Sequence, residues 1–233
     1  MTLVWVTRAL PGAEETARRV RALGLRAVIA PLIEVRALSG GPIDLTGVAA
    51  LAFTSANGVG PFAERCAERS LPVFAVGGAT AAAARAAGFA SVRSAGGDVA
   101  DLAEAIAPFK GSFRGAVLHP AAAQPAGDLV AALARVGVAA RAIAVYETRP
   151  AKVSPDILAM IPRMDVALLH SPKAAGVLAR LLRRRPAPRL TALCLSPAVA
   201  APLAAAGLAR VQAAPLPSEE ALLHLLSDLR GGA

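Results

Sequence analysis

Short apolar runs alternate with longer segments of mixed polarity along most of the chain. The runs are rich in Val, Ile, Leu and Ala, and Gly, Pro, Ser or Asn residues separate them from the next segment. Bounded apolar runs of this kind are typical of buried strands. The segments between them have helical spacing, and glycines such as Gly24, Gly88, Gly137 and Gly207 stand where helices are expected to end. The pattern predicts alternating strands and helices, and therefore parallel sheets with helices on both faces.

The expected elements follow from this alternation. We expect strands at Leu3–Val6, Leu25–Val35, Val48–Phe53, Val73–Val76, Val92, Gly115–His119, Val138–Tyr146, Val166–Leu169, Leu190–Leu195 and Val211. We expect helices from Pro11 to Gly24 and at Ala56–Arg69, Ala81–Ala87, Asp98–Ile106, Gly127–Val136, Lys173–Leu182 and Val199–Ala206, and a last one after Ser218. Asp98 and Ser218 are the expected N-caps of their helices.

The two halves of the chain resemble each other. An apolar run that ends in a small hydroxyl residue occurs at Val48–Asn57 and again at Asp165–Lys173. Gly24–Glu34 aligns with Gly137–Glu147, and Thr80–Gly88 aligns with Val199–Gly207. Such a repeat indicates a duplicated module, so we expect two similar α/β domains.

Charge and composition limit the possible partners. The 233 residues carry a formal net charge of +9, and aromatic residues make up only 3%. A basic surface attracts anions, but it can equally be a solvated, Arg-rich surface. Because so few aromatic side chains are available to stack on bases, nucleic acid is not an expected partner. The apolar stretch Thr191–Ala209 is interrupted by Pro197, Pro202 and Gly207, so we expect no membrane span.

The cysteines and the first residues show no pattern that is typical of a metal site, a disulfide framework or a signal peptide. Cys66 and Cys194 have no Cys or His neighbour at metal-binding spacing, so neither a metal site nor a disulfide framework is expected. We expect Cys194 to be a buried thiol, which fits a reducing cytoplasm. The first residues, Met1–Arg8, read as a strand and not as a signal peptide. No Walker A, GxGxxG, GxSxG or HExxH motif is present.

In open parallel sheets, ligands bind beyond the carboxyl-terminal ends of the strands. Six turns are expected there, including His119-Pro120, and they supply backbone N–H groups and hydroxyls. The candidate ligand-binding residues in the other five turns are Thr7, Arg8, Ser55, Asn57, Gly77, Thr80, Ser171, Lys173 and Ser196. Turns of this kind bind anions. The serines can equally be plain helix caps, and Gly77-Gly78 a tight turn before a helix.

Groups for acid–base chemistry are few. Tyr146, the only tyrosine, ends a predicted strand, where its phenol could donate a proton to a leaving hydroxyl or simply cap the edge of a core. We expect His170, at a strand end, to be a packed or rim histidine rather than a base, and His224 to be a structural residue of the last helix. No pair of carboxylates follows a predicted strand.

These motifs, taken together and in this order, resemble the uroporphyrinogen-III synthase family. The resemblance runs nearly end to end. The segments that carry it are Val6-Thr7-Arg8, Pro31-Leu32-Ile33, Phe53–Val59, Ala75–Thr80, Val145–Thr148, Leu169–Pro172 and Pro217-Ser218. One departure concerns the turn at Ser196-Pro197-Ala198-Val199, where the family often has Gly-Pro-Thr-Thr. A threonine hydroxyl is absent at that turn, although the first half retains Thr80.

The resemblance implies two flavodoxin-like α/β domains with parallel sheets, joined by a two-stranded linker. It implies a discontinuous first domain of residues 1–36 and 151–233, and a second domain of residues 37–150. The chain would cross between them near Arg36–Gly41 and Thr148–Pro155. The implied site is a cleft, with Ser171 and Lys173 holding carboxylates from one side.

The resemblance also implies a reaction. A hydro-lyase of this family closes hydroxymethylbilane, a linear polycarboxylate tetrapyrrole, to uroporphyrinogen III and inverts the last pyrrole ring. No metal or organic cofactor is needed, and a monomer suffices. Tyr146 matches a tyrosine proposed to assist loss of the hydroxyl, and Ser55 and Asn57 match the turn of the opposing domain. The alternative left open is a non-catalytic, two-domain binding protein for an anionic small molecule, which needs no proton donor at Tyr146.

Overall fold

The computed structural model describes residues 2–231, which form two compact units. Unit 1 contains the residues up to Glu34 together with those from Arg149 onward, and unit 2 is Val35–Thr148. The chain therefore passes from one unit to the other within the two strands β3 (Ile33–Ala37) and β8 (Ala140–Pro150). These two strands are neighbours in one sheet, so a two-stranded connection joins the units.

Unit 1 is built on a five-stranded sheet with the order β11-β10-β9-β1-β2, and all its strand pairs are parallel. Its strands are β1 (Leu3–Val6), β2 (Arg26–Ile29), β9 (Val166–Leu169), β10 (Thr191–Cys194) and β11 (Arg210–Ala213). Its helical segments are α1 (Gly12–Ala22), α6 (Pro155–Met160), η3 (Ile161–Arg163), α7 (Pro172–Arg184), α8 (Pro197–Ala200), η4 (Ala201–Leu203) and α9 (Glu219–Gly231).

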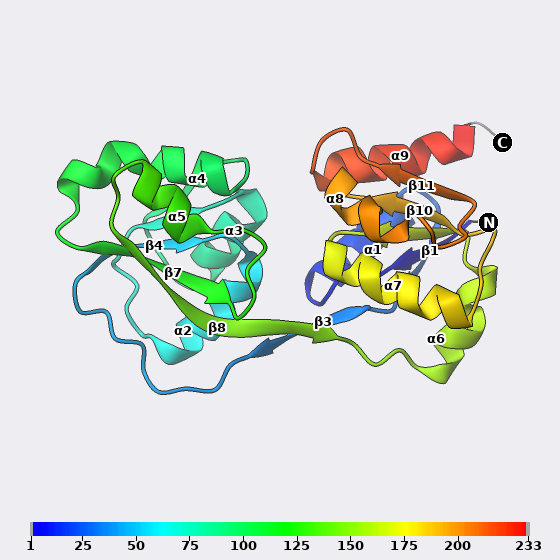
Figure 1. The fold of residues 1–233 in the computed structure, drawn as a ribbon, viewed down its shortest axis with the longest axis horizontal. Helices are drawn as coiled ribbons and strands as arrows, with labels where there is room; N and C mark the ends of the chain where they lie inside the picture. Colours follow the sequence, from blue (N-terminus) through cyan, green and yellow to red (C-terminus); the bar gives the residue numbers. More distant parts are fainter. Residues whose placement is uncertain (1, 232–233) are drawn as a thin grey trace. The chain divides into compact units, whose positions relative to one another are not determined.

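Side chains of the central strand β1 alternate between the two faces of this sheet. Val4 packs in a cluster with Val20 of α1 and Leu222 of α9, whereas Trp5 packs with α7 on the other face. Figure 1 labels strand β1 and these three helices. Trp5 is fully buried, and its indole N–H donates to the carbonyl of Ala30 at 2.7 Å. This alternation is the expected geometry of a strand buried on both faces.

Unit 2 is built on a six-stranded sheet with the order β3-β8-β7-β4-β5-β6. Its other strands are β4 (Val48–Phe53), β5 (Val73–Ala75), β6 (Val92–Ser94) and β7 (Ala116–Ala122). Its helical segments are η1 (Ala56–Gly58), α2 (Val59–Arg65), α3 (Gly78–Ala86), α4 (Val99–Ile106), η2 (Ala107–Ser112) and α5 (Leu129–Arg135). Leu51 and Phe53 face α2 and α3, while Ala50 and Ala52 face α4 and α5.

The predicted α/β class with parallel sheets is confirmed, but several boundaries are wrong. The expected strand Leu25–Val35 is two strands, β2 and β3, which belong to different sheets. Pro31 lies between them and lacks the N–H that a continuous ladder needs. The carbonyl of Ala30 is taken by Trp5 instead of by a strand partner.

Two further elements differ in length from the prediction. Strand β8 continues to Pro150, so part of the predicted linker is strand. The helix expected at Ala56–Arg69 ends at Arg65, and Cys66 is extended. Arg69 explains this end, because its guanidinium donates to the carbonyls of Ala63 and Cys66 and so satisfies groups that a longer helix would use.

Within residues 2–231, no helix is long and apolar enough to cross a membrane. The same residues contain no group of three or more His, Cys, Asp or Glu side chains that could hold a metal ion. Cys66 and Cys194 are both buried free thiols, and burial raises the pKa of the Cys194 thiol to about 12.

Candidate active site

In unit 2, the turn after β4 lies beside Tyr146, which is within strand β8. Ser55 is extended and caps η1, and its hydroxyl accepts a hydrogen bond from the N–H of Asn57 at 3.2 Å. The carbonyl of Tyr146 accepts from the N–H of Ala123 at 2.8 Å, which fixes the backbone at that point of β8. The structure thus brings the predicted residues Ser55, Asn57 and Tyr146 together within one unit.

Tyr146 has an environment suited to a neutral phenol. The residue is 6% exposed and packs in the apolar cluster that contains Phe53 and Phe62. Burial raises the pKa of Tyr146 above 10, and a hydrogen bond with the Ser55 side chain lowers it by less. At neutral pH the hydroxyl therefore keeps its proton. Because Ser55 already accepts from Asn57, its own hydroxyl hydrogen is free to point at the Tyr146 oxygen.

Gly58 determines how closely the turn approaches Tyr146. A Cβ atom built on Gly58 would lie 3.0 Å from the carbonyl oxygen of Pro120 and 3.3 Å from Cε1 of Tyr146. The first of these neighbours is backbone and cannot move aside easily. A glycine is therefore needed here for close packing, whereas the exposed Gly60 has no atom within 4 Å of a built Cβ.

Gly58→Ala is expected to lower the free energy of unfolding of unit 2 by about 1–3 kcal/mol, because the added methyl overpacks the turn. Gly60→Ala is the matched control. It should raise the free energy of unfolding by about 0.5–1 kcal/mol, because alanine has a higher helix propensity than glycine and position 60 is exposed. Urea unfolding followed by the absorbance of Tyr146, the only tyrosine, reports on unit 2. Equal stability of the two variants would show that the close approach has no energetic consequence.

The other predicted residues of unit 2 lie at the start of α3. Gly77 is the extended residue before this helix, and the two residues that follow it are exposed. Because Gly78 and Ala79 are exposed, the first backbone N–H groups of α3 are uncovered, and a Cβ on Gly77 would also meet no atom within 4 Å. Thr80 is only 5% exposed, so its side chain is buried within unit 2.

In unit 1, two predicted serines begin helices at the carboxyl ends of strands. The hydroxyl of Ser171 caps α7 by accepting from the N–H of Ala174 at 3.2 Å. Lys173 lies in the first turn of that helix and is exposed. Ser196 precedes α8, and its side chain makes no capping hydrogen bond.

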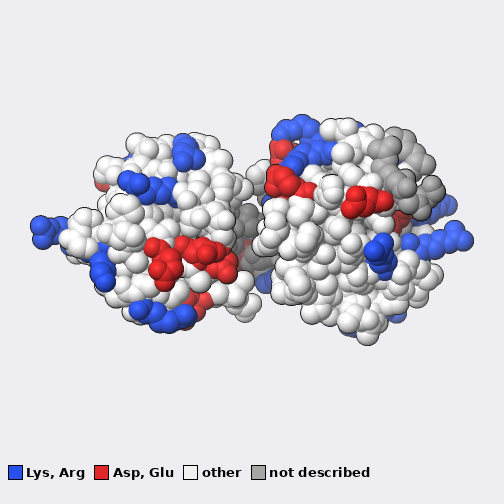
Figure 2. All heavy atoms as spheres, turned by 90° about the horizontal axis from the view of Figure 1, so that it is seen from above, with Lys and Arg blue, Asp and Glu red and all other residues white. Residues whose placement is uncertain are grey.

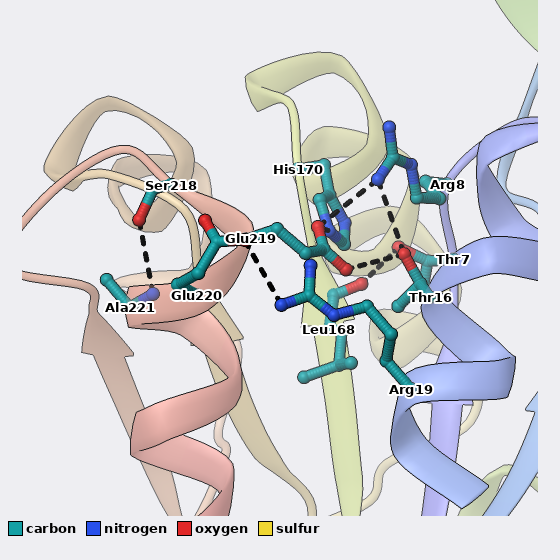
Figure 3. A network of polar contacts seen from close by, with 10 residues as sticks. All are labelled: Thr7, Arg8, Thr16, Arg19, Leu168, His170, Ser218, Glu219, Glu220 and Ala221. Atoms are coloured by element: carbon teal, nitrogen blue, oxygen red, sulfur yellow. Dashed lines mark hydrogen bonds and ion pairs between the residues drawn. The ribbon is translucent and has the colours of Figure 1, made fainter. Parts of the chain in front are cut away.

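A network of polar side chains lies at the same edge of unit 1 (Figure 3). Nη1 of Arg8 lies 3.2 Å from Oε2 of Glu219 and 3.3 Å from Oγ1 of Thr16. The Thr16 hydroxyl donates to Oε1 of Glu219 at 2.6 Å, and Nε2 of His170 donates to Oε2 at 2.8 Å. Thr7 lies beneath this network, fully buried, with its hydroxyl donating to the Leu168 carbonyl at 2.6 Å.

Glu219 is ionised in this network. Burial alone would raise the pKa of its carboxyl. The hydrogen bond and charge of His170, the hydrogen bond from Thr16 and the charge of Arg8 together outweigh burial and lower the pKa of Glu219 to about 2. Because the carboxylate can only accept, Nε2 of His170 must carry a proton. Nδ1 of His170 is buried and has no hydrogen-bond partner in the described part of the chain.

The remaining histidines are elsewhere. His119 and Pro120 lie inside β7 and not in a turn as predicted. His119 is 2% exposed, its Nδ1 donates to the carbonyl of Ala52 at 2.8 Å, and burial lowers its pKa. His224 has a side chain that is 79% exposed, with Asp228 at 3.8 Å. None of the described contacts brings either residue to Tyr146 or to Glu219.

A cavity of about 320 Å³ lies in unit 2 at the opposite end of its sheet. It is lined by residues at the starts of β4, β5 and β6, among them Ala49, Pro72 and Ser91, and by Phe109. The guanidinium of Arg93 stacks on the Phe109 ring at 4.7 Å. The cavity is therefore remote from the strand ends that carry the predicted residues of this unit.

The charged side chains do not form one continuous basic face in the view that Figure 2 shows. Lys and Arg residues are scattered over both units there, with Asp and Glu between them. On this face, the positively charged side chains are not gathered into a track for a nucleic-acid backbone.

Comparison with known proteins decides between the possible chemistries. The family model of uroporphyrinogen-III synthase HemD matches residues 14–224. The chain belongs to the uroporphyrinogen-III synthase family. It is therefore a hydro-lyase of heme and tetrapyrrole biosynthesis, and its substrate is a tetrapyrrole. The predicted family is confirmed.

Solved structures agree with this assignment at the level of the fold. The uroporphyrinogen-III synthetase of Helicobacter pylori 26695 is 20% identical, with a TM-score of 0.65 over 98% of this chain and 99% of that chain. A mutant uroporphyrinogen III synthase of Thermus thermophilus is 16% identical, with a TM-score of 0.53 over 99% of each chain. Curated protein sequences gave no match.

The sequence pattern did not reveal four residues that the structure places beside the predicted ones. They are Gly12, Thr16, Gly58 and Glu219. Glu219 was visible only as an acid in the first turn of the last helix, where acids are common. Its partner Thr16 is 203 positions away, so no local signal connects them.

Proposed function

We propose that this chain converts hydroxymethylbilane to uroporphyrinogen III with inversion of the last pyrrole ring. We propose further that Tyr146 is its proton donor. The observation that carries the second part is the buried phenol of Tyr146, protonated at neutral pH and paired with the hydroxyl of Ser55. Without such a donor, hydroxide would have to leave, which is a far poorer leaving group than water.

The chemistry required of the protein is modest. The bond between the terminal methylene carbon and the hydroxyl oxygen breaks, the electrons of the attached pyrrole stabilise the resulting cation, and the proton of Tyr146 converts the leaving hydroxide to water. The phenolate that remains is stabilised by the hydrogen bond from Ser55 and by the cation just formed. A proton released after ring closure restores Tyr146.

We propose that the carboxylates of the substrate are bound at the carboxyl-terminal strand ends of both units. In unit 1 the donors would be Arg8, Ser171, Lys173 and Ser196. In unit 2 they would be Ser55, Asn57 and the uncovered N–H groups after Gly77. Thr7 and Thr80 are buried, so we propose supporting roles for them beneath these turns.

We propose that the two units are the two domains predicted from the sequence, and that a single chain acts alone in the cytoplasm. Two buried free thiols suit a reducing compartment. The test of the proposed function is complementation. Expression of the chain in a bacterial strain that lacks uroporphyrinogen-III synthase should restore growth without added heme. Abundant, folded protein with no growth would contradict the proposal.

A further inference from the structure

Glu219 joins three separate elements of unit 1. It begins α9, and its carboxylate contacts Arg8 after β1, Thr16 in α1 and His170 after β9. Both of its oxygens are used, Oε1 by Thr16 and Oε2 by Arg8 and His170. Its neighbour Glu220 differs, because its side chain is 74% exposed and pairs with Arg19 at 3.1 Å on the surface. A merely favourable charge at the start of a helix needs no such set of contacts.

The contact with Glu219 orients the guanidinium of Arg8. A guanidinium is planar, so two acceptors on Nη1 also fix the directions of the other N–H groups. Here those acceptors are Glu219 and Thr16. On the other side lies Gly12, where a built Cβ would be 2.7 Å from Nε and 2.8 Å from Nη2 of Arg8. The side chain of Arg8 remains 34% exposed, so part of this oriented group can still meet a ligand.

Arg8 would not hold this position by itself. Its guanidinium lies against the first turn of α1, and the amino terminus of a helix carries partial positive charge, which repels a cation. The carboxylate of Glu219 offsets this repulsion. Removal of that carboxylate should therefore let Arg8 turn away into solvent.

We propose that Glu219 is a positioning residue, which holds Arg8 at the carboxyl-terminal edge of the sheet of unit 1 so that its guanidinium binds a carboxylate of the tetrapyrrole. This inference rests on the proposed function, because it takes a polycarboxylate as the substrate. Arg8 offers paired N–H groups that suit a carboxylate, and Glu219 acts on the substrate only through Arg8.

The direction in which Glu219→Gln changes substrate affinity distinguishes a positioning role from a purely electrostatic one. Glu219→Gln removes a negative charge from the neighbourhood of a polyanionic ligand. If Glu219 acted only through its charge, this change would strengthen substrate binding. If Glu219 positions Arg8, the same change weakens binding although the site becomes more positive.

The experiment compares three purified variants in steady-state kinetics with hydroxymethylbilane. Glu219→Gln is expected to raise KM about tenfold, equivalent to about 1.4 kcal/mol, with kcat changed less than about twofold. Glu220→Gln, which removes the same charge from the same helical turn, should leave KM and kcat unchanged. Gly12→Ala should raise KM like Glu219→Gln, because its methyl displaces Arg8 while Glu219 stays intact. Since the displaced group is the end of a flexible side chain, this variant should keep the fold.

An unchanged or lower KM for Glu219→Gln would overturn the proposal. If that variant does not fold, Gly12→Ala decides, and a wild-type KM for Gly12→Ala would overturn it. Binding of uroporphyrin III, the oxidised product, to the same variants gives a readout independent of turnover. If the wild type binds this porphyrin but forms no type III isomer, the proposed function fails, while the order of affinities still tests the role of Glu219.

Discussion

Tyr146→Phe is expected to slow ring closure about 100-fold or more under single-turnover conditions, since a positioned general acid contributes about that much. The change removes one oxygen and leaves the ring in its cluster with Phe53 and Phe62. Substrate binding should therefore stay within about threefold of wild type. Rapid quenching, followed by oxidation and separation of the porphyrin isomers, measures the rate. Ser55→Ala should show a smaller loss, because it removes only the partner of the phenol. A wild-type rate for Tyr146→Phe would exclude Tyr146 from the mechanism.

The state of the phenol can be measured separately. Because Tyr146 is the only tyrosine, the alkaline absorbance change of the phenolate reports on this residue alone. Burial raises the pKa of Tyr146, so the phenol should ionise at a higher pH in the folded protein than in the unfolded chain, and Ser55→Ala should raise the pKa further. Ionisation near or below the ordinary value would mean that the phenol is not enclosed as described.

The second large effect concerns stability in acid. The pKa of Glu219 falls from its ordinary value of 4.5 to about 2 on folding, so the unfolded chain binds this proton more readily. The resulting stabilisation is present above pH 4.5 and is lost as the pH falls toward 2. A shift of this size corresponds to about 3 kcal/mol, of which the largely buried carboxylate should retain most. Above pH 4.5 the wild type should therefore have a higher free energy of unfolding than Glu219→Gln. This difference should disappear as the pH falls toward 2, because the variant has no carboxyl group at this position to titrate.

The measurement is urea unfolding of both proteins between pH 2 and pH 6, followed by fluorescence of Trp5. This is the only tryptophan and lies in unit 1 with Glu219, so it reports on the relevant unit. Other carboxylates titrate in both proteins and cancel in the difference. A stability difference that does not change with pH would show that Glu219 is not held ionised by its neighbours.

The repeat was the most informative feature of the sequence. Val48–Asn57 and Asp165–Lys173 both predict a strand followed by a turn into a helix, and in the structure Ser55 and Ser171 cap the helical segments that follow. Alternation of short apolar runs and helical segments was enough to predict parallel sheets, because strands buried on both faces leave this signal. Only one strand, β7, separates β8 from β4 in the sheet, so the side chain of Tyr146 in β8 reaches Ser55 in the turn after β4.

Two kinds of feature could not be predicted from the sequence. The run Leu25–Val35 is mostly apolar, with Arg26 and Glu34 as its charged residues, and no local pattern shows that β2 and β3 enter different sheets. Pro31 marks the break in the strand, and the structure shows that Trp5 takes the carbonyl of Ala30 at this point. Glu219 similarly depends on tertiary contacts, since an acid at the start of a helix is common and its role is set by Arg8 and His170. Local patterns predict elements, whereas such contacts arise only when distant elements meet.

The most direct test of the proposed reaction is the isomer composition of the product. Hydroxymethylbilane closes spontaneously to the type I isomer, without inversion of the last ring. Purified wild-type protein, incubated with fresh hydroxymethylbilane and analysed after oxidation, should yield mainly the type III isomer, in a proportion that rises with protein concentration. Product that remains type I at every protein concentration would contradict the proposed reaction.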